Sequence, residues 1–168
     1  MKRLPLLIAA AIAFAPMAAR AALPVTPAPD QAALLTSPDP KLAANKKLVY
    51  DMWRAILLGG HVEMAEQYFA PDYMQHNPMV DTGRDAMVKF FSTRPKKDIP
   101  PTIPGLVSVV AERDRVVMSF VRELKRPDDP TKTYTTTWFD MFRIQNGKIQ
   151  EHWDVAMLPA PPPPKPAQ

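Results

Sequence analysis

Side chains that can move protons gather in two short segments of the chain. One is Tyr73-Met74-Gln75-His76-Asn77-Pro78, the other is Gln150-Glu151-His152-Trp153-Asp154, and Asp140 belongs to the predicted strand before the second segment. A carboxyl group among aromatic and methionine side chains tends to have a raised pKa, which makes it a better base near neutral pH. Carboxyl, imidazole and phenol groups are the side chains that general acid/base chemistry uses, so these two segments are the first candidates for a reactive site.

Strand geometry decides which of these residues can meet. Successive side chains of a strand point to opposite faces, so His152 and Asp154 share one face of the last predicted strand. Across a strict two-residue turn at Asn146-Gly147, Asp140 would lie on the face away from His152. A bulge or a longer loop would bring the two together. The sequence by itself leaves this register open.

The first half of the core has helical spacing. Asp39 is a favourable N-cap with Pro at the next position, and an apolar stripe follows at three- and four-residue spacing until Gly59-Gly60. A second short helix is predicted over about 62–69. Thr82 and Asp85 fit a capping box before a third helix, which ends ahead of Pro95.

The second half has the period of β-strands. Four runs rich in Val, Thr, Phe, Tyr and Ile are bounded by turn residues, and they are Leu106–Glu112, Arg115–Leu124, Thr133–Ile144 and Lys148–Met157. Asn146-Gly147 between the last two is a strong hairpin signal. Helices followed by an antiparallel meander predict an α+β domain, with three N-terminal helices packed on one face of a curved sheet.

Proline marks the expected limits of this domain. Segments 23–40 and 159–168 are rich in proline, which lacks a backbone donor and favours extended chain, so we expect a linker and a tail outside the packed core. The globular domain is expected over residues 41–158. The run Pro161–Pro164 could alternatively be a ligand for a proline-recognising groove.

Composition and the first residues restrict the function classes. The 168 residues contain no cysteine, which excludes disulfides, thiolate catalysis and Cys-ligated metals. Residues 1–22 are predicted to be a cleaved signal peptide, with Lys2 and Arg3 before an apolar run and Ala19-Arg20-Ala21 at the cleavage site. We expect a secreted or periplasmic protein without membrane contact after cleavage, although an uncleaved leader would act as an anchor. The remaining charges nearly balance and give no basis for binding nucleic acid.

The order of elements and one closing motif carry a family resemblance. The motif is Gly147-Lys148-Ile149-Gln150-Glu151-His152-Trp153-Asp154, preceded by Asp-x-Phe-Arg at 140–143 and, earlier, by His76-Asn77-Pro78. Over about residues 43–158 the chain resembles the SnoaL-like branch of the nuclear-transport-factor-2-like superfamily. The resemblance implies a cone-shaped fold with Asp140, His152 and Asp154 in one cavity. That superfamily uses one scaffold for isomerases, dehydratases, cyclases, epoxide hydrolases and non-catalytic binding domains.

The resemblance also implies roles for the candidate residues. SnoaL-type polyketide cyclases close a ring by intramolecular aldol condensation without metal or organic cofactor, using an Asp as general acid/base, and Asp154 looks like the matching position. Asp140 would act as a protonated donor or orient His152. The related ketosteroid isomerases have an Asp base near the position of Asn77, so that base is missing here. Because these cyclases use neither metal nor organic cofactor, we expect no cofactor here. We also expect the chain to form a homodimer.

The remaining candidates are expected to contact a small apolar ligand or substrate, and they are His76, Asn77, Tyr73, Trp53 and Trp138. Each candidate also has a structural interpretation. Asp154 could be satisfied by His152 or by backbone donors, and Asp140 could be a partner of Arg143. His152 could be a packed core histidine. His76 and Asn77 could tie down the loop before Pro78, since Asn suits turns, and the tryptophans could belong to the core.

Two further alternatives concern metal and catalysis. His76, His152, Asp154 and Asp140 include the ligand types of a two-His-carboxylate metal centre, but no familiar spacing supports one and no metal is expected. The first function hypothesis is an exported, cofactor-independent lyase or isomerase acting on an apolar carbonyl compound. The second is a non-catalytic domain that holds an apolar ligand or pairs with itself through the sheet.

Overall fold

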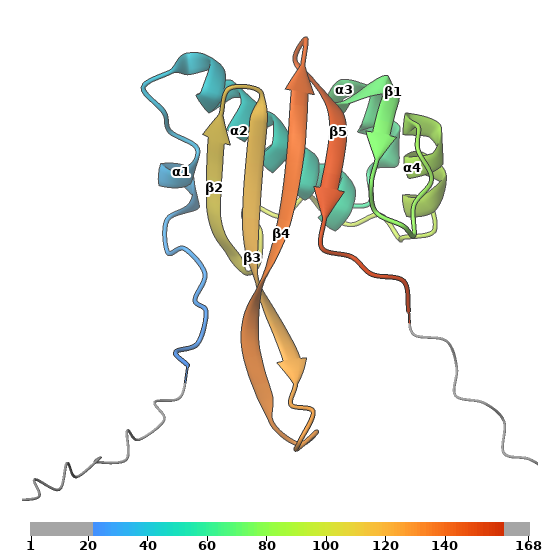
Figure 1. The fold of residues 1–168 in the computed structure, drawn as a ribbon. Helices are drawn as coiled ribbons and strands as arrows, with labels where there is room; N and C mark the ends of the chain where they lie inside the picture. The colour runs from blue at the N-terminus through green and yellow to red at the C-terminus, as the bar shows by residue number, and fades with distance from the viewer. Residues whose placement is uncertain (1–21, 160–168) are drawn as a thin grey trace, which may run out of the picture.

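The computed structural model describes residues 22–159, so residues 1–21 of the predicted signal peptide and most of the C-terminal proline run lie outside the described residues. Five strands form one curved sheet in the order β1-β5-β4-β3-β2, and helices lie against one of its faces (Figure 1). The expected α+β class is confirmed. Among the described residues, no helix has the length and apolar character needed to cross a membrane.

Four strands follow the predicted antiparallel meander, and a fifth was not predicted. The meander consists of β2 (Leu106–Glu112), β3 (Arg115–Lys125), β4 (Thr133–Gln145) and β5 (Lys148–Asp154). The fifth strand, β1 (Phe69–Gln75), pairs in parallel with β5, with Gln75 beside His152. Pro71 favours a turn by sequence, yet an edge strand tolerates it because one side of an edge makes no ladder bonds. The parallel pair brings the two polar segments of the sequence together.

The helices precede the meander. They are α1 (Gln31–Leu34), α2 (Pro40–Met52), the π-helix η1 (Trp53–Leu58), the short 3-10 helix η2 (Val62–Met64), α3 (Ala65–Tyr68) and α4 (Arg84–Phe91). The predicted cap of α2 is confirmed, because the Asp39 carboxylate accepts the backbone N–H of Lys41 at 2.7 Å. The predicted capping box of α4 is wrong. Its N-cap is Gly83, and the Thr82 hydroxyl instead bonds the backbone of Gln75, which ties the loop to β1.

The proline-rich segment before α2 is not the free linker that its composition predicts. Its Ala28 N–H donates to the Leu106 carbonyl at 2.8 Å, and Leu34 and Leu35 pack against the core. The Gln31 side chain bonds both the N–H and the carbonyl of Ile103. These contacts place α1 beside β2 (Figure 1), so the expectation that this segment stays outside the packed core is wrong.

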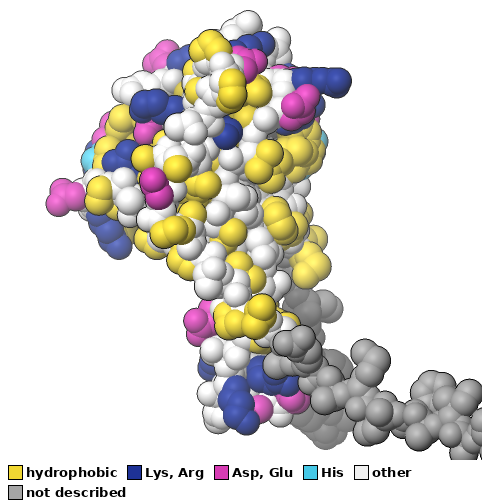
Figure 2. Space-filling model, turned by 90° about the vertical axis from the view of Figure 1, so that its left-hand side faces the viewer, with side chains coloured by type: hydrophobic (Ala, Val, Ile, Leu, Met, Phe, Trp, Pro, Cys, Tyr) yellow, Lys and Arg dark blue, Asp and Glu magenta, His cyan; other side chains and the backbone are white. Residues whose placement is uncertain are grey.

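The β3–β4 hairpin extends well past the body of the domain. The two strands pair without interruption from Arg115 opposite Arg143 to Lys125 opposite Thr133. Figure 2 shows the far end of the hairpin as a narrow projection where basic and acidic side chains gather. Arg126 pairs there with Asp128. The body of the domain therefore holds the core, and the projection is a charged ribbon.

A bulge fixes the register that the sequence left open. Asn146 and Gly147 have φ of 52° and 69°, the left-handed conformation that a tight hairpin turn of this kind requires. After Ile144 pairs with Ile149, the pairing skips Gln150. Asp140 therefore lies opposite Asp154, and Phe142 lies opposite His152. The inner face buries Val116, Met118, Phe142 and Ile149 beneath the helices.

Candidate functional site

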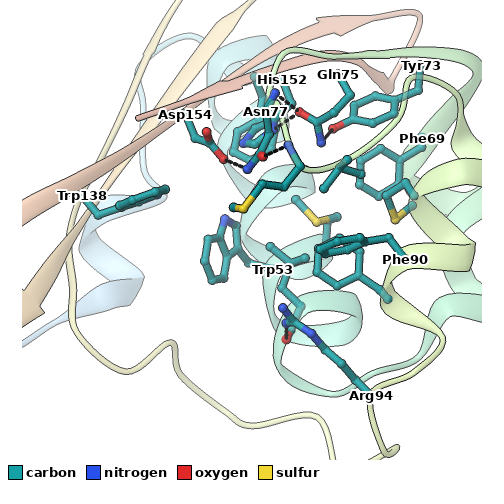
Figure 3. A pocket seen from close by; sticks show the side chains of 17 residues that line it. Trp53, Phe69, Tyr73, Gln75, Asn77, Phe90, Arg94, Trp138, His152 and Asp154 are labelled. Carbon is teal, nitrogen blue, oxygen red and sulfur yellow. Dashed lines mark hydrogen bonds between the residues drawn. The ribbon is translucent and has the colours of Figure 1, made fainter. Parts of the chain in front are cut away.

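A cavity of about 310 Å³ lies between the inner face of the sheet and the helical layer (Figure 3). Its wall is mostly apolar, and the large side chains in it are Trp53, Phe69, Phe90, Phe91, Trp138 and Phe142. Polar groups occupy its two ends. Gln75, Asn77, His152 and Asp154 lie at the sheet end, and Arg94 lies beyond Trp53 and Phe90. An apolar hollow with a few convergent polar groups has the character of a small-molecule site.

Asp154 is held by neutral donors at the sheet end of the cavity. One carboxylate oxygen accepts the side-chain amide of Asn77 at 2.6 Å, and the other accepts the N–H of Ala156 at 2.9 Å. Asn77 is itself fixed, because its carbonyl oxygen accepts the Met79 N–H at 2.9 Å. A carboxylate has about four lone-pair sites, so each oxygen of Asp154 keeps acceptor capacity for a ligand. Backbone and amide donors satisfy Asp154, and His152 does not bond to it.

The hydrogen bonds of Gln75 define the orientation of His152. The Gln75 side-chain oxygen accepts the backbone N–H of Asn77 at 3.1 Å, so that atom is an acceptor and the amide orientation is determined. The same oxygen lies 2.8 Å from Nδ1 of His152, which must therefore donate. Nε2 of His152 lies 3.1 Å from the nearer carboxyl oxygen of Asp140. That contact ties the imidazole ring to β4.

Asp140 lies behind this site and does not line the cavity. It is 4% exposed, and one oxygen accepts the indole N–H of Trp138 and lies within hydrogen-bond distance of Nε2 of His152, each at 3.1 Å. Its other oxygen is buried without a partner among the described residues. The expectation that Asp140 shares the cavity with Asp154 is wrong in this respect, because His152 and Asp154 line the cavity and Asp140 does not. Arg143 is not its partner either and bonds Glu151 at 2.7 Å.

Tyr73 supplies a phenol next to these carboxyl groups. Its side chain is buried, and its oxygen accepts the Gln75 amide at 3.1 Å. Burial raises the pKa of Tyr73 far above its ordinary value, and the nearby charges of Asp154 and Asp140 raise it further. The phenol therefore stays protonated, and its hydrogen remains available for donation.

Residues 49–152 match the family model of the SnoaL-like domain, which covers more than half of the chain. The chain belongs to the SnoaL-like family. Among solved structures, this SnoaL-like chain is similar to a candidate polyketide cyclase from Acidithiobacillus ferrooxidans (15% identity, TM-score 0.48, covering 67% of this chain and 87% of that one). It is also similar to an NTF2-like protein of unknown function from Burkholderia pseudomallei (14% identity, TM-score 0.48, covering 68% of this chain and 91% of that one). A third similar structure is that of IdmH, a candidate polyketide cyclase from Streptomyces antibioticus (19% identity, TM-score 0.45, covering 66% of this chain and 90% of that one). No curated protein matches the chain.

His76 is placed outside the cavity of the SnoaL-like domain, so its predicted contact with a ligand there is wrong. Its ring stacks on Trp153 with centroids 5.0 Å apart, and its Nε2 lies 2.8 Å from the Glu151 carboxylate. The adjacent residue, Asn77, points the other way and reaches Asp154. Neighbouring residues of an extended segment face opposite sides, which separates the two.

The structure places the other ligand-contact candidates at the cavity, and their contact with a ligand stays a prediction. Tyr73, Trp53 and Trp138 all line the cavity together with Asn77. Trp53 is the first residue of η1, and its ring packs on Phe120 with centroids 4.4 Å apart. A π-helix has i→i+5 hydrogen bonds, and short π segments within helices are frequent at functional sites.

Sequence reasoning missed two polar residues of the cavity. Gln75 belongs to one of the two polar segments of the sequence, and no pattern there gives it a role, although it joins Tyr73, Asn77 and His152. Arg94 follows α4, and a single arginine before a proline carries no motif that would reveal it. Only the packing of α4 against the rest of the fold brings Arg94 to the cavity.

One part of the site carries the ligand types of a metal centre. Asp140, His152 and Asp154 each offer one donor atom, and the three atoms lie within 4.8 Å of one another. The second histidine of the two-His alternative, His76, lies on the opposite face of the sheet. His76, His152, Asp154 and Asp140 therefore do not form a two-His-carboxylate metal centre in this structure.

Proposed function

We propose that this SnoaL-like domain is a cofactor-independent lyase or isomerase of the aldol-condensation or cyclase type, acting on a small apolar carbonyl compound. The observation that carries the proposal is the carboxylate of Asp154, held by Asn77 and Ala156 at the end of an apolar cavity of about 310 Å³. A carboxylate fixed in such surroundings is suited to act as a base beside a bound carbonyl group.

In the proposed reaction Asp154 removes a proton from the carbon next to the carbonyl group. The electron pair of the broken C–H bond moves into the carbonyl group, and the phenol of Tyr73 donates a hydrogen bond to the enolate oxygen. The enolate carbon then attacks a second carbonyl carbon of the same molecule and forms a C–C bond. The resulting alkoxide takes its proton back from Asp154, so the protein ends as it began.

The remaining polar residues position these two groups. Asn77 holds one oxygen of Asp154, and Gln75 holds the hydroxyl of Tyr73. His152 is bonded through both ring nitrogens, to Gln75 and to Asp140, so it anchors Gln75 and does not itself take a proton from the substrate. Asp140 acts through His152.

Exchange of the hydrogens next to a ketone tests the first step without knowledge of the natural substrate. We expect the purified protein to accelerate deuterium uptake into the methyl group of 2-acetylnaphthalene in D₂O, followed by NMR. Asp154→Asn should lower that rate by about 10²- to 10⁴-fold, the usual contribution of a positioned acid or base. The matched control is Glu151→Gln, which alters a carboxylate of the same strand that bonds outward to His76 and Arg143. Unchanged exchange in Asp154→Asn would refute the proposal.

A second candidate function is non-catalytic binding of an apolar small molecule. It is favoured by the fact that both oxygens of Asp154 already accept hydrogen bonds, as a structural carboxylate would. This function predicts ligand binding without any hydrogen exchange. Asp154→Asn would then change affinity alone.

We also propose that the protein is exported, as the first 22 residues of the sequence suggest. Expression in a Gram-negative host and intact-mass measurement of the periplasmic fraction test this. The expected mass lacks residues 1–22. A full-length mass in the membrane fraction would instead support an uncleaved anchor.

A further inference from the structure

The two ends of the cavity carry opposite charges. Asp154 lies at the sheet end, beside Asn77 and His152, whereas Arg94 lies beyond Trp53 and Phe90 (Figure 3). Apart from His152, the other side chains of the wall are neutral, and most of them are apolar. A ligand in this cavity therefore experiences a negative group at one end and a positive group at the other.

Arg94 is held in position at its end of the cavity. One terminal nitrogen of its guanidinium donates to the Leu57 carbonyl of η1 at 3.1 Å. The guanidinium carbon lies 4.5 Å from the centroid of the Phe91 ring, and the Arg94 backbone N–H donates to the Phe91 carbonyl at 3.0 Å. These contacts reduce the freedom that an exposed arginine would lose on binding a ligand.

The charge of Arg94 is available to a ligand. Within residues 22–159, no carboxylate lies within ion-pair distance of Arg94, whereas Arg54, Arg115 and Arg143 each have an acidic partner. The Leu57 carbonyl uses one of the five N–H donors of the guanidinium. The remaining donors form a planar fork that matches the geometry of a carboxylate.

We propose that the ligand of this cavity is an apolar, ring-containing molecule with an anionic group such as a carboxylate, and that Arg94 binds this group. The anion would be repelled by Asp154 at the sheet end, so the charge difference orients the molecule with its neutral end toward Asp154. For the substrate, the inference rests on the proposed function: in the same orientation, the substrate is a carbonyl compound that carries a carboxylate. Its carbonyl group then lies at Asp154 and its carboxylate at Arg94.

Two fluorescent probes with the same phenylaminonaphthalene skeleton test the ligand class. 8-Anilinonaphthalene-1-sulfonate carries an anionic sulfonate, and N-phenyl-1-naphthylamine is neutral. We expect the wild-type protein to bind the sulfonate about tenfold more tightly, because a hydrogen bond to a charged group contributes more than one between neutral groups. The preference should shrink as sodium chloride is raised, since salt screens an exposed charge.

Variants at position 94 show whether this arginine is responsible. Arg94→Gln should abolish the preference while binding of the neutral probe stays within about twofold of wild type, and Arg94→Lys should restore part of it. The matched control is Arg122→Gln. Arg122 also stands over an aromatic ring, 4.6 Å from the centroid of Trp138, but does not line the cavity. This control should keep the full preference for the sulfonate.

Several outcomes would overturn the inference. They are a wild-type protein without preference for the sulfonate, an Arg94→Gln variant that keeps the preference, and equal loss of both probes in that variant while circular dichroism shows it folded. Binding of the probes requires no turnover. A preference for the sulfonate that depends on Arg94, without any hydrogen exchange, would therefore support this inference and refute the proposed function. Hydrogen exchange without that preference would support the proposed function and refute this inference.

Discussion

The two faces of the last strand use the same residue types for different purposes. On the inner face, His152 bonds the side chains of Gln75 and Asp140, Asp154 bonds the Asn77 amide and a backbone N–H, and both lie at the cavity. On the outer face, Glu151 bonds His76 and Arg143, and Trp153 stacks on His76. The Glu151 carboxylate outside is paired with Arg143, while Asp154 inside is bonded to neutral donors and has no ion-pair partner among the described residues.

This difference depends on one extra residue. Gln150 forms the bulge in β5. If Gln150 instead paired with Arg143 in a regular hairpin, Asp154 would lie on the face away from Asp140. The same alternation separates Asn77, inside, from His76, outside. A histidine or a carboxylate in the sequence thus acquires its role from the face on which the strand places it, and adjacent residues have unrelated roles.

The largest expected effect on stability is at the buried pair of the inner face. Asp140→Ala removes the acceptor of the Trp138 indole N–H and the partner of Nε2 of His152, and the His152 side chain is buried. We expect the free energy of unfolding in urea to fall by about 3–5 kcal/mol. Asp114→Ala breaks an exposed pair with Arg115 and should cost about 1 kcal/mol or less. Equal losses of unfolding free energy in the two variants would show that the contacts of Asp140 stabilise the fold no more than an exposed ion pair does.

The next effect concerns the uncovered outer face. Phe139 is 48% exposed and Val110 58% exposed, and the helices lie on the other side of the sheet (Figure 1). We expect two copies of the chain to associate through this face. Light scattering after size exclusion should give a dimer at micromolar concentration, and Phe139→Asp should raise the dissociation constant at least tenfold. A wild-type monomer would contradict the prediction.

The third effect compares two neighbouring residues. Asn77→Ala removes the donor that holds Asp154, so we expect the exchange rate with 2-acetylnaphthalene to fall about 10- to 100-fold. His76→Ala alters only outer-face contacts and should leave the rate within about twofold. A larger loss in His76→Ala than in Asn77→Ala would reverse the assignment of faces.

Most of the fold could be predicted because its signals are local. The cap at Asp39, the turn at Asn146-Gly147 and the four strands of the meander each depend on residues close in sequence. The strand β1 was missed because Pro71 and a short apolar run resemble the end of a helix. Only its pairing with β5, distant in sequence, makes it a strand.

The candidate site was predicted in part. The inward placement of His152 followed from the family resemblance, and the bulge that produces it carries no local signal that distinguishes it from a regular hairpin. The position of Asp140 behind the site depends on how the Trp138 side chain packs, which residue types alone do not define. Arg94 depends on the position of a whole helix.

The smallest expected effect is a pH dependence of stability from the outer face. Burial by itself would raise the pKa of Glu151, but hydrogen bonds with His76 and Arg143 outweigh it and lower the pKa below its ordinary value of 4.5. A carboxyl group with a lowered pKa in the folded state stabilises the protein above its ordinary pKa, and this contribution disappears as the pH falls through the folded-state pKa. Glu151→Gln should therefore reduce the free energy of unfolding by about 1 kcal/mol or less at pH 7, and the two unfolding curves should converge in acid. Because Glu151 lies outside the cavity, the same variant should exchange ketone hydrogens at the wild-type rate. A pH-independent difference between the two proteins would mean that Glu151 stabilises the sheet by packing, and that its charge has no part in it.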